Sequence, residues 1–131
     1  MNGFDQQIRR CISPDNVKIV YARTGSGLPL VKTGNWLTDL ETDAESFLWR
    51  HWIEEFSQNR LFFRFDHSGS RDAAADFSLE AQLRDIETVA ADAGLERFAL
   101  LGISNGAAAA VAYAALRPEN VDCLILLNGA A

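Results

Sequence analysis

The spacing of hydrophobic and polar residues predicts the elements of the fold before any motif is considered. Strict alternation in VKIVYAR (17–23) predicts a strand with one buried face. Shorter strand candidates are IRRCI (8–12) and LPLVKTG (28–34), and the turn SPDN (13–16) makes the first two strands antiparallel neighbours. Nearly continuous apolar runs at 60–66 and 97–103 predict strands buried on both faces, and a last strand is predicted at 121–127.

Three segments between these runs show helical spacing instead. In 45–57 apolar residues recur three and four positions apart, whereas His51 falls among charged residues on the opposite face. A third helix is predicted at 105–117. Strands and helices that alternate in this order predict an α/β fold, a mostly parallel sheet with helices on both faces. The second helix can be capped by Ser78 and ended by Gly94, with an expected inner stripe of Leu79, Leu83, Ile86, Val89 and Ala93.

Composition narrows the classes of function. The 131 residues are one domain by length, residues 1–131, and their 48% hydrophobic and 23% charged content is typical of a globular protein. The formal net charge of −6 argues against nucleic acid as a partner. Neither a secretory signal nor a membrane-spanning apolar run is found, so we expect a cytoplasmic protein that does not bind membranes.

Cys11 and Cys123 are expected to be buried, reduced thiols.

The most informative motif is Gly102-Ile103-Ser104-Asn105-Gly106, which matches G-x-S-x-G between a predicted strand and a predicted helix. In such a turn the glycines avoid collisions with neighbouring backbone, and the serine hydroxyl rises above the sheet. The N–H groups of the following helix can then stabilise negative charge that develops beside the hydroxyl. The alternative interpretation is a tight strand-to-helix turn without chemistry.

Three stretches carry a resemblance to a known family: SPDNVKIVYARTGSGLPLVKTGNWLTDLE (13–41), FSLEAQLRDIETVAADAGLERFALLGISNG (77–106) and YAALRPENVDCLILLNG (113–129). With them the chain resembles the first half of an α/β-hydrolase domain, and it is most similar to the hydrolase-like domains of adenylate-cyclase and LuxR-type regulatory proteins. The resemblance implies a truncated α/β-hydrolase fold with six of the family's eight strands. It also implies that the family's usual acid and histidine, which follow the last two strands, are absent from this sequence.

Two further positions follow from the resemblance. In the family, the turn after the third strand supplies a backbone N–H for the oxyanion, and the matching segment is Thr33-Gly34-Asn35-Trp36. The N–H groups of Asn35 and Asn105 would together hold the oxyanion. The alternative is that this segment is a loop with Trp36 packed beneath it. In the turn after the fourth strand, Ser68 stands where relatives have an arginine.

The sequence holds two histidines that could act as a general base, His51 and His67. His51 is expected on the exposed face of the first helix. His67 directly follows a strand of the parallel sheet, so it lies at the same edge as Ser104, with strand ends about 10 Å apart if one strand separates them. His67 would take the proton of Ser104 and give it to the leaving group. The alternative is a polar turn residue without a role in chemistry.

Together these residues predict a small serine hydrolase that acts on short-chain carboxylic esters through an acyl-enzyme on Ser104. A small-molecule ester is the expected partner, and neither a metal nor a cofactor is expected. Two other interpretations stay open: a module that senses a ligand without turnover, and a degenerate fragment without activity of its own. The expected site consists of the catalytic Ser104 and His67, the oxyanion amides of Asn35 and Asn105, and the elbow glycines Gly102 and Gly106.

The last apolar strand leads to a prediction about assembly. VDCLILLNGAA (121–131) would leave an apolar edge strand with open backbone groups, and such an edge favours association. We therefore expect a homodimer with a two-fold, apolar interface of about 2,000 Å² or more. Such a dimer could also bring a side chain of one copy toward Ser104 of the other. Light scattering at micromolar concentration tests this expectation, and a stable monomer would contradict it.

Overall fold

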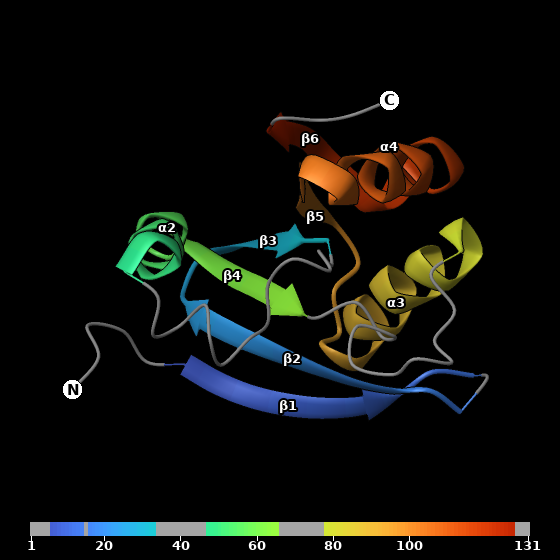
Figure 1. The fold of residues 1–131 in the computed structure, drawn as a ribbon, viewed down its shortest axis with the longest axis horizontal. Helices are drawn as coiled ribbons and strands as arrows, with labels where there is room; N and C mark the ends of the chain where they lie inside the picture. Colours follow the sequence, from blue (N-terminus) through green and yellow to red (C-terminus); the bar gives the residue numbers. More distant parts are fainter. Residues whose placement is uncertain (1–5, 15, 34–46, 66–77, 128–131) are drawn as a thin grey trace.

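The computed structural model describes residues 6–14, 16–33, 47–65 and 78–127, which form one sheet with helices on both sides (Figure 1). The strands are β1 (Gln6–Ile12), β2 (Lys18–Gly25), β3 (Leu28–Lys32), β4 (Arg60–Phe65), β5 (Phe98–Ile103) and β6 (Val121–Leu127). The helices are α2 (Phe47–Phe56), α3 (Leu79–Asp92) and α4 (Ala107–Leu116), with short 3₁₀ turns η1 (Ser104–Gly106) and η2 (Pro118–Asn120). None of these described helices is long and apolar enough to cross a membrane.

The strands lie in the order β1-β2-β4-β3-β5-β6. β2 runs antiparallel to β1 and β4, while β4, β3, β5 and β6 are parallel neighbours. The mostly parallel sheet is therefore confirmed, as is the antiparallel first pair. From β3 the chain continues to β4 on one side and then to β5 on the other, so the strand order reverses at β3. Open parallel sheets bind ligands beyond the carboxyl ends of the strands at such a reversal.

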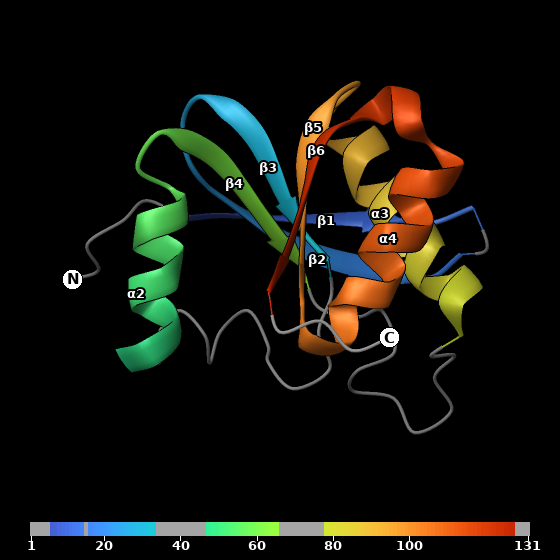
Figure 2. The ribbon, with the colours of Figure 1, turned by 90° about the horizontal axis from the view of Figure 1, so that it is seen from above.

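The two faces of the sheet have separate hydrophobic cores. Helices α3 and α4 cover one face (Figure 2), where Phe63 and Leu100 are fully buried. Helix α2 covers the other face, where Ile53 packs in one cluster with Phe62 and Leu101. Successive residues of β4 and β5 thus serve opposite cores, because side chains alternate across a strand. This double burial explains why their sequences are almost continuously apolar.

Local signals set the ends of α3 as predicted. Ser78 Oγ accepts a hydrogen bond from the Ala81 N–H at 3.2 Å, and Gly94 follows the helix with a φ angle of +72°. The predicted inner stripe is wrong at Leu79, whose side chain is exposed, whereas Ala81 and Asp85 are buried. The helix is rotated so that Ala81 and Asp85, four residues apart and on one face, point inward in place of Leu79.

On α2 the charged face lies where the sequence placed it. His51 is exposed, and Arg50 and Glu54 form an ion pair with 3.2 Å between Nε and Oε1. On the opposite face, the ring of Phe56 lies 5.3 Å from that of Phe62, centroid to centroid. The polar face of this helix, with His51 on it, is therefore confirmed.

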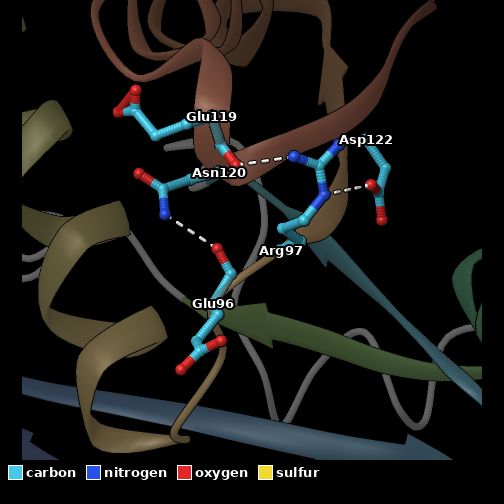
Figure 3. Close-up of polar contacts among 5 residues, drawn as sticks. All are labelled: Glu96, Arg97, Glu119, Asn120 and Asp122. Atoms are coloured by element: carbon cyan, nitrogen blue, oxygen red, sulfur yellow. Dashed lines mark hydrogen bonds and ion pairs between the residues drawn. The ribbon is translucent and has the colours of Figure 1, made fainter.

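At the amino ends of β5 and β6, polar contacts join the turns that precede these two strands (Figure 3). The Asn120 side chain donates to the Glu96 carbonyl at 2.7 Å. Arg97 donates from Nε to Asp122 Oδ1 at 2.7 Å and from Nη1 to the Glu119 carbonyl at 2.9 Å. The contacts are exposed, so each stabilises the fold by no more than about 1 kcal/mol, but together they fix where β6 begins beside β5.

Within the described sheet, β6 is an edge strand that pairs only with β5, and several of its apolar side chains are exposed. Leu124 and Leu126 are 37% and 44% exposed, and Cys123 is exposed as well, which corrects the prediction of two buried thiols. Cys11 is buried, and desolvation by burial raises its pKa to about 11, so it is a protonated thiol at neutral pH. The homodimer stays a prediction, for which this apolar edge is the surface to test.

Candidate active site

Ser104 lies at the turn between β5 and α4, in a backbone conformation that few residues adopt. Its φ angle is +54°, in the left-handed region where the Cβ of an L-residue crowds the backbone. Among the described residues, Asn16 shares a positive φ without being glycine, and asparagine tolerates this region in turns. For serine the conformation costs about 1 kcal/mol or more, which the surrounding structure must offset. The strain therefore makes Ser104 a candidate functional residue.

Gly102 allows α4 to lie directly against β5. A Cβ at this position would be 2.8 Å from Ala107 Cα, 2.8 Å from Ala110 Cβ and 3.0 Å from the Gly106 carbonyl oxygen. Ala107 and Ala110 are themselves buried. The helix can start this close to the strand because all the side chains at the contact are small or absent.

The turn continues as η1 and then α4, so Ser104 stands at the amino end of a helix. The Ala107 N–H donates to the Ser104 carbonyl and closes the first turn. Asn105, whose N–H is the predicted oxyanion donor, is the middle residue of η1. N–H groups at a helix start carry partial positive charge and have no partner from the preceding turn, so they can stabilise an anion beside Ser104.

The carboxyl end of β3 meets the same turn. Thr33 directly follows β3 and is 1% exposed. Its Oγ1 donates to the Gly106 carbonyl at 2.9 Å, and its N–H donates to the Leu101 carbonyl at 2.9 Å. The strand-order reversal thus brings the end of β3 against the serine turn, in the part of an open sheet where ligands bind.

A strand, a strained serine and a helix thus follow one another at the carboxyl edge of a mostly parallel sheet. The model of the alpha/beta hydrolase fold matches residues 41–131. This chain belongs to the alpha/beta hydrolase fold family. The predicted family and fold are therefore confirmed.

Relatives of this chain are longer proteins. "Putative carbamate hydrolase RutD" of Klebsiella pneumoniae (strain 342) is 36% identical over 69 residues, which are 50% of this chain and 26% of that protein. The structure of a hydrolase from Pseudomonas aeruginosa PA01 has a TM-score of 0.80 at 18% identity and covers 95% of this chain and 47% of its own. The structure of the esterase RhEst1 from Rhodococcus sp. ECU1013 has a TM-score of 0.73 at 24% identity, over 93% of this chain and 46% of its own. The chain spans about a quarter of RutD and less than half of the two solved hydrolases.

Two predicted site residues, Asn35 and His67, lie outside the described residues, as do Trp36 and Ser68. In the sequence, Asn35 is the second residue after Thr33, and His67 is the second after the end of β4. β3 lies between β4 and β5, as assumed from the sequence, so the ends of β4 and β5 are about 10 Å apart.

Two buried cations near the site were not foreseen from the sequence. Lys32 and Arg64 are register partners on β3 and β4 and are 6% and 3% exposed. Arg64 donates to the Gln6 side chain, and Lys32 donates to the Thr33 carbonyl at 3.3 Å. Both cations border a small cavity with Trp52 and Ile103 on the α2 side of the sheet. The sequence does show a charged residue within each of these apolar strands, which could have drawn attention to them. The alternation of side chains along a strand, however, predicts that a charged residue is exposed.

The described residues contain no group of three or more histidine, cysteine, aspartate or glutamate side chains that could hold a metal ion.

We expect Gly102→Ala to destabilise the fold, because the new Cβ would collide with Ala107 and Ala110 at 2.8 Å. Overpacking of this kind costs about 1–3 kcal/mol, which chemical denaturation measures. Gly94→Ala is the matched control, since its Cβ would meet nothing within 4 Å and would cost only the left-handed φ, about 1 kcal/mol. A Gly102→Ala variant as stable as the wild type would contradict the close approach of α4 to β5.

Proposed function

We propose that this alpha/beta hydrolase cleaves carboxylic esters of short acyl chains, with Ser104 as the nucleophile. The observation that carries the proposal is the φ angle of +54° at Ser104, in a G-x-S-x-G turn beside the strand-order reversal. Such a turn exposes the serine Oγ above the sheet, where a substrate carbonyl can approach it. A turn without chemistry has no need of a strained serine at this position.

Acylation and deacylation follow from the groups around the turn. Ser104 Oγ attacks the ester carbonyl carbon while a base takes the hydroxyl proton. The carbonyl oxygen becomes an oxyanion, held by the N–H groups of Asn105 and Asn35. Collapse breaks the C–O bond, and the alkoxide leaves with the proton as an alcohol while the acyl group stays on Ser104. Water then attacks the acyl-enzyme, and the same steps release the carboxylic acid and restore the serine.

His67 is the proposed base. Of the two histidines in the sequence, His51 is exposed on α2, on the opposite face of the sheet from α4. His67 follows β4, which is one strand removed from β5 at the same edge. A histidine on the loop after β4 can cover much of the gap of about 10 Å. A base supplied by a second copy of the chain is the alternative source, and it requires the predicted homodimer.

The names of two similar proteins support hydrolysis at a carbonyl carbon. RutD is named as a carbamate hydrolase, and the Rhodococcus protein RhEst1 is an esterase. Carbamates and esters share a carbonyl flanked by an alkoxy oxygen, and a serine hydroxyl attacks both in the same way. We propose an ester because the nitrogen of a carbamate donates electron density to its carbonyl carbon, which makes that carbon harder to attack than the carbonyl carbon of an ester.

A module that binds a small acyl compound without turnover is the second candidate. It is favoured by the scarcity of bases, since one of only two histidines in the sequence lies on the exposed face of α2. Such a module would bind a ligand saturably and give no acyl-enzyme.

We expect wild-type protein to release a burst of product from an activated aryl ester, stoichiometric with protein, and to react with a fluorophosphonate at Ser104. Ser104→Ala should lower turnover by about 10³-fold or more and abolish labelling, because the nucleophile is gone. Its thermal stability should not fall, since alanine fits where serine fits. Wild-type turnover in this variant would show that Ser104 is not the nucleophile.

His67→Ala should lower kcat by about 10²-fold or more and remove the limb of the pH–rate profile near neutral pH, because the general base is lost. His51→Ala is the matched control and should leave kcat unchanged, since His51 is exposed on α2. An unchanged profile in His67→Ala would reduce His67 to a turn residue. A loss in His51→Ala would instead point to a base donated by a second copy.

A further inference from the structure

We propose that Thr33 is a positioning residue that holds the serine turn in register with the end of β3. The proposal deepens the proposed function, since the segment that follows Thr33 carries Asn35, the second oxyanion donor. Thr33 would thus fix the two halves of the oxyanion site relative to each other.

Thr33 is held through each of its three polar groups. Its N–H donates to the Leu101 carbonyl on β5, and its Oγ1 donates to the Gly106 carbonyl in the turn, both at 2.9 Å. Its own carbonyl accepts from Lys32 Nζ at 3.3 Å. A residue that is 1% exposed and held at three points has little freedom to move, so the end of β3 is fixed against the serine turn.

The acceptor of the Thr33 hydroxyl lies inside the serine turn. The Gly106 carbonyl oxygen is also the atom that would be 3.0 Å from a Cβ at Gly102. It is therefore confined between β5 on one side and Thr33 Oγ1 on the other. The hydrogen bond fixes the orientation of the peptide that joins η1 to α4, and with it the N–H groups of the turn.

Oxyanion donors act through their positions. Both N–H groups must lie within hydrogen-bond distance of one developing oxyanion, and a displacement of about 1 Å can cost about 10²-fold in rate. Asn105 and Asn35 belong to segments that are far apart in the sequence. The hydrogen bond from Thr33 to Gly106 joins these segments, and its two residues are 73 positions apart. Thr33 keeps these two segments together. It contacts no reacting atom itself and is therefore a positioning residue.

The test compares Thr33→Val, which keeps the shape but removes the hydroxyl, with Thr33→Ser, which keeps the hydroxyl. We expect Thr33→Val to lower kcat for an activated aryl ester by about 10- to 100-fold with KM within about 3-fold, and Thr33→Ser to stay within about 3-fold in both. Amide hydrogen exchange over residues 101–110 should become faster in Thr33→Val and stay near wild type in Thr33→Ser. If Thr33→Val does not fold, Thr33→Ala, which leaves room rather than a misplaced methyl, carries the same expectation.

Equal kcat and equal exchange in Thr33→Val and wild type would overturn the proposal. So would equal losses in Thr33→Val and Thr33→Ser, because a purely packing role does not distinguish the hydroxyl. A wild type that gives no burst and no Ser104 labelling would overturn the proposed function instead. In that case exchange alone decides whether Thr33 holds the turn.

Discussion

Helix α4 can begin directly at the end of β5 because Gly102 has no side chain and Ala107 and Ala110 have small ones. This contact determines the rest of the site. The chain turns within η1, Ser104 has a φ angle of +54°, and α4 begins directly after this turn. The electrostatic benefit of the helix start and the strain at the serine therefore have one cause, the close packing of helix on strand.

The strand order decides what stands opposite this turn. Because β3 lies between β4 and β5, the carboxyl end of β3 is the immediate neighbour of the serine turn, and that of β4 is one strand further away. A base from the segment after β4 would therefore have to cross the end of β3 to reach Ser104. The strand order therefore puts the end of β3, rather than the end of β4, in contact with the serine turn.

A strained turn needs a stable frame, and the two cores supply it. The central strands are buried on both faces, with Phe62 in the cluster under α2 and Phe63 in the cluster under α3 and α4. Burial of side chains of this size stabilises a fold by about 1.5–3 kcal/mol each, more than the strain at one serine. At the other end of the sheet, the contacts of Arg97 and Asn120 fix the start of β6. The frame is thus held at both ends while the serine turn remains strained.

The sequence by itself determined the elements and the serine turn. The periodicity of apolar residues, the helix caps and the turn residues all depend on residues that are close together in the sequence. The strands, the cap at Ser78 and the polar face around His51 were therefore predictable. Tertiary structure alone decided the burial of Lys32 and Arg64, the exposure of Leu79 and Cys123, and the hydrogen bond from Thr33 to Gly106. These depend on which strand lies beside which and on how a helix rotates against the sheet. No local pattern encodes that, because the partners meet only after the chain between them has closed.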